Sequence, residues 1–222
     1  MSMFLIYDAE KYEYILQPGG YLLLAFILLA LLASIRLFGA KSGPSKPGTK
    51  RLVFCSMSMA LAMVTSFIKL ASLPYGGSIT LFSMLFISLI GYFYGAKTGI
   101  LTGIAYGILQ LITGPYIYAP LQVLLDYPLA FGALGLSGLF PKTKHGFMVG
   151  YTASVLGRYL CHVVSGYIFF AEYAPEGMNA LVYTFLYNLT YILPELVATI
   201  ILLSIPATAK AMTQVKQQAV SL

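Results

Sequence analysis

Four ionisable residues lie inside apolar stretches of the sequence, namely Asp126, Arg158, His162 and Glu195. A charge within a membrane is costly and usually serves a function. Arg158 and His162 are four residues apart, which places them on one face of a helix. Because a guanidinium pairs well with a carboxylate, we expect Glu195 to be the structural partner of Arg158. Asp126 is then the carboxylate left for a cationic ligand, unless both acids bind Arg158 or burial protonates one of them.

Further polar and aromatic residues could complete a site around Asp126. Asn188 and Tyr183 lie in the outer part of the last apolar run, and a side-chain amide in a membrane needs hydrogen-bond partners. Phe170, Tyr167 and Tyr173 surround the outer end of the preceding run. An aromatic cavity with one acid and a few neutral donors suits a flat, cationic heteroaromatic ligand.

The elements that must position these residues are long apolar segments. The 222 residues are 59% hydrophobic and 9% charged, with a mean hydropathy of +0.84. Since a soluble domain carries about 25% charged residues, the composition argues against a soluble enzyme or a disordered chain and predicts an all-α polytopic membrane protein. We expect seven spanning helices, at about 18–38, 52–72, 79–96, 98–113, 119–140, 147–170 and 179–206.

The distribution of basic residues predicts the orientation. With the N-terminus outside, ten of the thirteen Lys and Arg residues fall on the inner side, as the positive-inside rule requires. The net charge of +6 is therefore explained without a nucleic acid partner. We expect an N-out, C-in chain in two parts. Residues 1–51 form an extra transmembrane helix and a basic cytoplasmic linker, and residues 52–222 form a six-helix domain with a short cytoplasmic tail.

Glycines recur every four residues at Gly91, Gly95, Gly99, Gly103 and Gly107. Small residues at this spacing let helix backbones approach closely. A sliding or partner surface is the alternative, but we favour internal packing.

The sequence contains no motif typical of catalysis. It has no P-loop, GxSxG or HExxH pattern and no metal-binding spacing of Cys and His. A metal or proton site made from lone Asp, His and Glu residues is conceivable, but their spacing does not demand it. We therefore expect no enzyme activity, cofactor or metal, and any ATP-driven work must come from another chain.

One segment resembles a known family. Residues 114–140 (GPYIYAPLQVLLDYPLAFGALGLSGLF) are similar to the thiamine-specific S component, the substrate-binding membrane subunit, of energy-coupling factor (ECF) transporters. The segments SLPYGGSITLFSM, RYLCHVVSGYIFF and LVYTFLYN support this resemblance, which covers about residues 52–206. It implies a six-helix bundle that binds thiamine with high affinity near the outer face of a prokaryotic cell membrane.

The resemblance also assigns site residues. The family's carboxylate corresponds to Asp126, and its loop tyrosine to Tyr116 or Tyr118. Phe170 stands where the family has a stacking Trp, and a second Trp near the first outer loop has no counterpart. The full implied substrate site comprises Asp126, Tyr127, His162, Asn188, Tyr183, Phe170, Tyr116, Tyr118 and Arg158.

The resemblance further implies partners, namely a transmembrane coupling subunit and two cytoplasmic ATPases. Ser56 and Ala60 stand where the family has a small-xxx-small docking motif. A standalone ion- or proton-coupled carrier of thiamine or a related compound is the alternative, with Asp126, His162 and Glu195 as a relay. The role of the extra helix and the oligomeric state stay open.

Overall fold

A computed structural model describes residues 5–8, 13–19, 22, 47–73, 77–113, 115–140 and 145–220. The predicted first span, 18–38, and the linker after it lie almost entirely outside the described residues. The extra N-terminal helix and the division of the chain at residue 51 therefore stay predictions.

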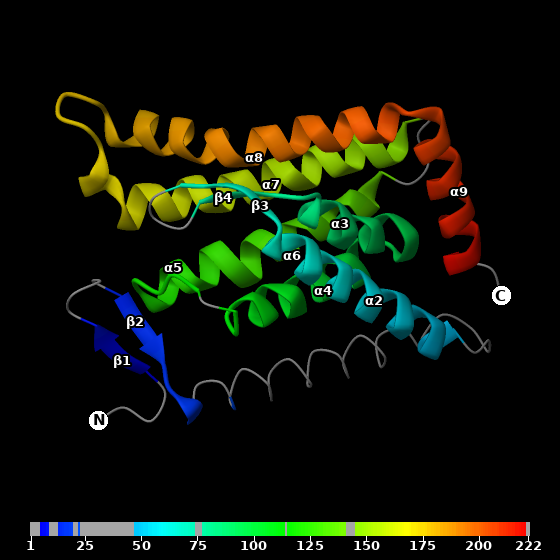
Figure 1. The fold of residues 1–222 in the computed structure, drawn as a ribbon, viewed down its shortest axis with the longest axis horizontal. Helices are drawn as coiled ribbons and strands as arrows, with labels where there is room; N and C mark the ends of the chain where they lie inside the picture. The colour runs from blue at the N-terminus through cyan, green and yellow to red at the C-terminus, as the bar shows by residue number, and fades with distance from the viewer. Residues whose placement is uncertain are drawn as a thin grey trace.

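The described part of the chain is mostly helical (Figure 1). The long helices are α2 (Pro47–Phe67), α3 (Ser83–Tyr94), α4 (Ala96–Gln110), α7 (Gly146–Phe169), α8 (Ala180–Ser204) and α9 (Pro206–Val220). Between α4 and α7 the chain forms α5 (Pro120–Leu124), the π-helical turn η2 (Leu125–Leu129), α6 (Ala130–Ala133) and the 3-10 helix η3 (Leu134–Leu139). A short 3-10 helix, η4 (Ala171–Tyr173), follows α7. The strands are β1 (Leu5–Asp8), β2 (Glu13–Leu16), β3 (Lys69–Ser72) and β4 (Ser78–Thr80), paired as two antiparallel hairpins.

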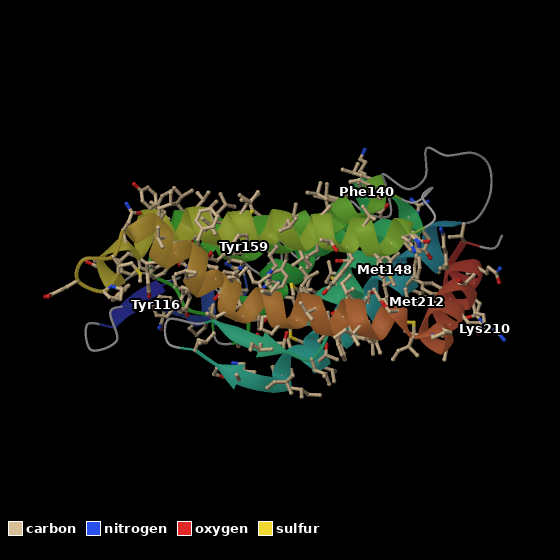
Figure 2. All side chains as sticks on the ribbon, turned by 90° about the horizontal axis from the view of Figure 1, so that it is seen from above. Tyr116, Phe140, Met148, Tyr159, Lys210 and Met212 are labelled. Atoms are coloured by element: carbon tan, nitrogen blue, oxygen red, sulfur yellow. The ribbon has the colours of Figure 1, made fainter. Side chains whose placement is uncertain are left out.

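The helices form an elongated bundle. Helices α7 and α8 run side by side along its length, and α9 crosses one end (Figure 1). Figure 2 shows Tyr116 near the opposite end from Lys210 and Met212 of α9. Helices α2 and α8 are each long and apolar enough to span a membrane, and α3 is apolar but shorter. The described helices therefore agree with a helical membrane protein, whereas seven spans and their orientation stay predictions.

Close backbone packing joins α4 to the segment 125–139. A side chain at Gly103 would collide with the Phe131 carbonyl, and one at Gly107 with the Tyr127 carbonyl. From the other side, a side chain at Gly135 would collide with the backbone of Ile100. The prediction of internal packing is thus confirmed for Gly91, Gly99, Gly103 and Gly107. Gly95 differs, because nothing lies within 4 Å of an added Cβ there and its φ of +87° instead serves the turn between α3 and α4.

Pro128 interrupts the helix that carries the predicted carboxylate. Proline has no N–H to donate to the carbonyl one turn earlier. The hydrogen-bond ladder widens here, and the Ala130 N–H binds the Leu125 carbonyl five residues before it. Such π-turns are frequent at functional sites, and this one contains Asp126 and Tyr127.

Two segments differ from the predicted helices. The run 52–72 is helical only to Phe67, and Lys69–Ser72 pairs with Ser78–Thr80 instead. The reason is local, because the connecting sequence (LPYGG) is rich in turn-forming residues. At the other end of the chain, the predicted tail contains the helix α9.

Candidate functional site

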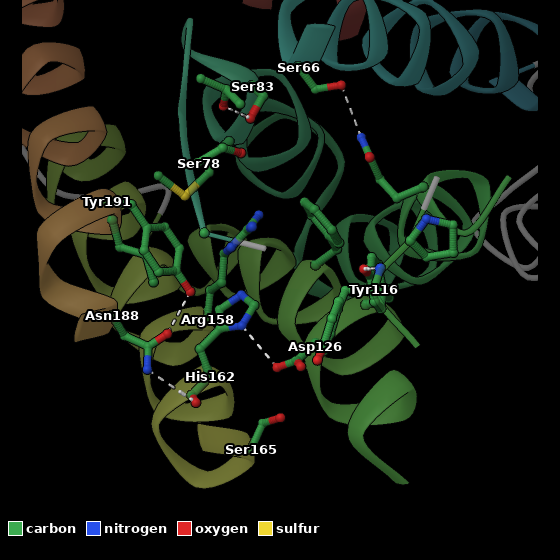
Figure 3. A pocket seen from close by; sticks show the side chains of 18 of the residues that line it. Ser66, Ser78, Ser83, Tyr116, Asp126, Arg158, His162, Ser165, Asn188 and Tyr191 are labelled. Carbon is green, nitrogen blue, oxygen red and sulfur yellow. Dashed lines mark hydrogen bonds and ion pairs between the residues drawn. The ribbon is translucent and has the colours of Figure 1, made fainter. Parts of the chain in front are cut away.

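A cavity of about 220 Å³ lies between α7, α8, η2 and the β3–β4 hairpin (Figure 3). The predicted residues that line it are Asp126, Tyr127, His162, Asn188, Tyr183, Phe170, Tyr116 and Arg158. Tyr118 does not line the cavity but contacts the rings of Phe169 and Phe170. Of the two loop tyrosines, the structure therefore places Tyr116 on the cavity.

The Asp126 carboxylate is held through both of its oxygens. Its Oδ1 lies 3.0 Å from Nδ1 of His162, and its Oδ2 accepts a hydrogen bond of 2.7 Å from Nε2 of Gln122. The side chains of His162 and Asp126 are 12% and 15% exposed. Each carboxylate oxygen can accept more than one hydrogen bond. The group is thus fixed in direction and can still bind a cation or a donor.

Gln122 connects this carboxylate to the loop before α5. Its Oε1 accepts from the Tyr118 N–H at 3.0 Å, and its Nε2 lies 3.3 Å from the Tyr116 carbonyl. The side chain is only 2% exposed. Sequence reasoning missed Gln122, although its position four residues before Asp126 on the same helical face was an available signal.

The environment of Arg158 differs from the prediction. Its Cζ lies 4.0 Å from the centroid of the Phe131 ring, a cation–π contact. Its Nε and Nη1 atoms are buried and have no hydrogen-bond partner among the described residues. The expected pairing of Arg158 with Glu195 is therefore wrong.

Glu195 binds the β3–β4 hairpin and the start of α3 instead. Its carboxylate accepts from Thr80 Oγ1 at 2.7 Å and from Ser83 Oγ at 3.3 Å. It also accepts from the Met84 N–H at 2.9 Å. The first N–H groups of a helix lack partners within the helix, so α3 supplies a donor that a buried carboxylate can use.

A row of tyrosines on α8 forms another wall of the cavity. Tyr183, Tyr187 and Tyr191 are spaced by four residues, and successive ring centroids lie 5.9 Å apart. Tyr187 also accepts a hydrogen bond from the Gly77 N–H at 3.3 Å. Sequence reasoning found Tyr183 but missed the other two, which share its helical face at spacings of four residues.

Both the nitrogen and the oxygen of the Asn188 amide form hydrogen bonds with neighbouring groups. Its Nδ2 donates to the Thr184 carbonyl at 2.9 Å and lies 3.4 Å from the His162 carbonyl. Its Oδ1 accepts from the Tyr191 hydroxyl (Figure 3). Asn188 therefore joins α7 to α8 and orients Tyr191, whose ring meets that of His162 edge-on.

Aromatic side chains gather around Phe170, which lines the cavity. Its ring centroid lies 5.9 Å from that of Tyr116 and 5.6 Å from that of Tyr118. Tyr173 stacks on Phe170 at 6.1 Å.

No cluster of three or more His, Cys, Asp and Glu side chains that could hold a metal ion occurs within the described part of the chain.

The predicted docking residues lie on α2 and do not line the cavity. Ser56 and Ala60 are exposed on the face of α2 that also carries exposed Val53, Met57 and Val64. This face of α2 is therefore exposed and mostly apolar, and it includes two small residues.

Comparison with known proteins identifies the family of the chain. Residues 52–215 match the family model described as Thiamine transporter protein (Thia_YuaJ). Thiamine transporter ThiT of Bacillus subtilis (strain 168) is 35% identical over 169 residues, which cover 69% of this chain and 88% of that protein. ThiT of Lacticaseibacillus paracasei is 32% identical over 123 residues, 48% of this chain and 61% of that protein.

A solved structure of ThiT from Listeria monocytogenes is also similar. It superposes with a TM-score of 0.59 at 28% identity and covers 71% of this chain and 96% of that one. The relatives are transporters rather than enzymes, as the sequence predicted. The family resemblance is thus confirmed, and the chain belongs to the thiamine transporter family.

Proposed function

We propose that this chain is the substrate-binding subunit of an ATP-driven ECF importer and that it binds thiamine in the cavity around Asp126. The observation that carries the proposal is a fixed carboxylate inside an aromatic cavity, with His162 and Gln122 orienting its two oxygens. Thiamine combines a flat aminopyrimidine with a permanently cationic thiazolium ring, so it needs both a counter-charge and aromatic surfaces.

The residues of the cavity fit these needs. Asp126 supplies the negative charge, which counts for more in a partly buried site than in water. Phe170 and Tyr116 line the cavity with aromatic rings, and a ring attracts a cation that lies over its face. Arg158 repels a cation, so we infer that the thiazolium ring lies on the Asp126 side and a neutral part of the ligand faces the guanidinium.

The energy source is proposed to be a separate module of one transmembrane coupling subunit and two cytoplasmic ATPases. Ser56 and Ala60 support this because small residues on an exposed helix face permit close approach of a partner helix. The same proposal places the chain in a bacterial cell membrane with the cavity facing outward and α9 facing the cytoplasm.

Calorimetric titration of the purified protein with thiamine tests the binding site. We expect saturable binding, and at least tenfold weaker binding for Asp126→Asn because the cation loses its counter-charge. Glu172→Gln, which removes an exposed acid outside the cavity, is the control and should bind like the wild type. An unchanged dissociation constant for Asp126→Asn would refute this role.

Uptake in cells tests the energy source. We expect thiamine uptake only when the coupling subunit and ATPases are co-expressed. Uptake without them that an uncoupler abolishes would instead favour an ion- or proton-coupled carrier.

A further inference from the structure

Three side chains on one face of α7 carry polar atoms without partners in the cavity wall. Among the described residues, Nε and Nη1 of Arg158, Nε2 of His162 and Oγ of Ser165 are buried and lack a hydrogen-bond partner. Their spacing of four and three residues aligns them along roughly 10 Å of the helix. The two other side chains with such atoms, Arg51 and Thr102, do not line this cavity.

Ser165 differs from the other buried serine and threonine hydroxyl groups of α7 and α8, which are Ser154, Thr184 and Thr199. A serine or threonine in a membrane helix commonly satisfies itself by donating to a carbonyl one turn earlier. Ser154 does so at 2.8 Å, Thr184 at 2.9 Å and Thr199 at 2.7 Å. Ser165 is 1% exposed, yet no such bond forms within the described structure. A buried hydroxyl without a partner is costly.

The surroundings of Ser165 leave the cavity as the place where its partner can come from. The next residue, Gly166, packs so closely on Thr184 of α8 that a Cβ there would collide with the threonine methyl group. Ser165 itself lines the cavity, one turn along α7 from His162 (Figure 3). Asp126 and Ser165 line the same cavity, so one ligand can contact both side chains.

We propose that Ser165 is a ligand-binding, specificity-determining residue whose hydroxyl forms a hydrogen bond with a neutral polar group of the bound ligand. This inference rests on the proposed thiamine site. Thiamine carries two kinds of neutral hydrogen-bonding group, the hydroxyl of its hydroxyethyl arm and the nitrogens of its aminopyrimidine. Ser165 binds one of them while Asp126 balances the cationic ring.

Calorimetric titration of Ser165→Ala with thiamine tests the proposal. We expect about a tenfold weaker affinity, the value of one hydrogen bond. The melting temperature should not fall, because the removed oxygen bonds nothing in the described protein. Ser154→Ala is the matched control: it loses a bond to the Tyr151 carbonyl outside the cavity, so its melting temperature should fall while its affinity is kept.

Two thiamine analogues identify the partner group. One lacks the hydroxyl of the side arm, and the other has its whole aminopyrimidine replaced by a phenyl ring, so that all of its ring and amino nitrogens are removed. The penalty of Ser165→Ala should vanish with the analogue that lacks the partner of the serine and persist with the other.

The outcomes separate this inference from the proposed function. Failure of the wild-type protein to bind thiamine contradicts the function itself. Wild-type binding together with an affinity of Ser165→Ala within twofold of it overturns only the role of Ser165. A penalty that persists with both analogues also overturns the direct hydrogen bond.

Discussion

The cavity differs from the glycine-rich packing region, where α3, α4 and α7 meet residues 125–139, in how fully its buried polar groups are hydrogen-bonded. In the packing region, Ser137 donates to the Ser88 carbonyl at 2.6 Å, and the hydroxyls of Ser88 and Ser154 lie 3.3 Å apart. Thr102 is the exception among the described residues of that region. In the cavity, Arg158 and Ser165 are left with buried atoms that bond to nothing in the described protein.

We attribute this difference to two roles, since the packing region stabilises the fold and the cavity is the proposed place of ligand recognition. Where backbones touch, a polar group that lacks a partner would weaken the fold for no gain, so neighbouring carbonyls supply partners. Where a ligand binds, a donor without a partner in the protein is useful because the ligand can accept its hydrogen bond. Mutations in the two regions should therefore have different signatures, in stability for the first and in affinity for the second.

The largest effect should come from Gly135→Ala in the packing region. The new Cβ would collide with the backbone nitrogen of Ile100, which cannot move without shifting α4. We expect a loss of about 3 kcal/mol or more in stability, and with it loss of a monodisperse protein in detergent. Gly48→Ala is the control, because nothing lies within 4 Å of the added methyl group. Size-exclusion chromatography and thermal melting measure this loss. A Gly135→Ala protein as stable as wild type would contradict the assignment of a stabilising role to the packing region.

Much of this architecture follows from apolar run length. The predicted spans 147–170 and 179–206 closely match α7 (Gly146–Phe169) and α8 (Ala180–Ser204). The β3–β4 hairpin was missed because a strand that continues an apolar helix has similar hydropathy, and hydropathy alone does not distinguish the two. The four ionisable residues of the apolar runs, Asp126, Arg158, His162 and Glu195, all line the cavity, and burial of charge is rare without a function.

The partners of those charges could not be predicted. Pairing Arg158 with Glu195 assumes that opposite charges in a membrane seek each other. The structure satisfies Glu195 with hydroxyls and a helix N–H, and it places Arg158 on the Phe131 ring. Which neutral groups are nearby depends on helix rotation and on the hairpin, neither of which the linear pattern contains.

The second largest effect should come from Glu195→Ala, which tests the boundary between the two regions. The change leaves the buried Met84 N–H without its acceptor, whereas the hydroxyls of Thr80 and Ser83, 2.7 Å apart, still bond each other. Since an unsatisfied buried donor costs about 1–3 kcal/mol, the melting temperature should fall clearly. Thiamine affinity should fall too, because Thr80 and Ser83 line the cavity.

Glu195→Gln is the conservative comparison, since it keeps one acceptor oxygen and should recover part of both losses. Melting curves and calorimetry on the same preparations separate the two effects. If Glu195→Ala kept wild-type stability and lost only affinity, Glu195 would belong with the ligand-facing groups of the cavity.

The smallest effect of the three should come from Gln122→Leu, which changes how Asp126 is held without removing its charge. Leucine cannot donate to Asp126 Oδ2 or accept from the Tyr118 N–H. The carboxylate can then rotate about its remaining contact with His162, so we expect thiamine to bind about fivefold more weakly, somewhat less than the loss of one full hydrogen bond. Gln214→Leu, on the exposed side of α9, is the matched control.

Because orientation rather than charge is lost, the combined Gln122→Leu and Asp126→Asn variant should bind no more weakly than Asp126→Asn alone. Additive losses would show that Gln122 acts on the ligand or on the loop at Tyr116 independently of Asp126.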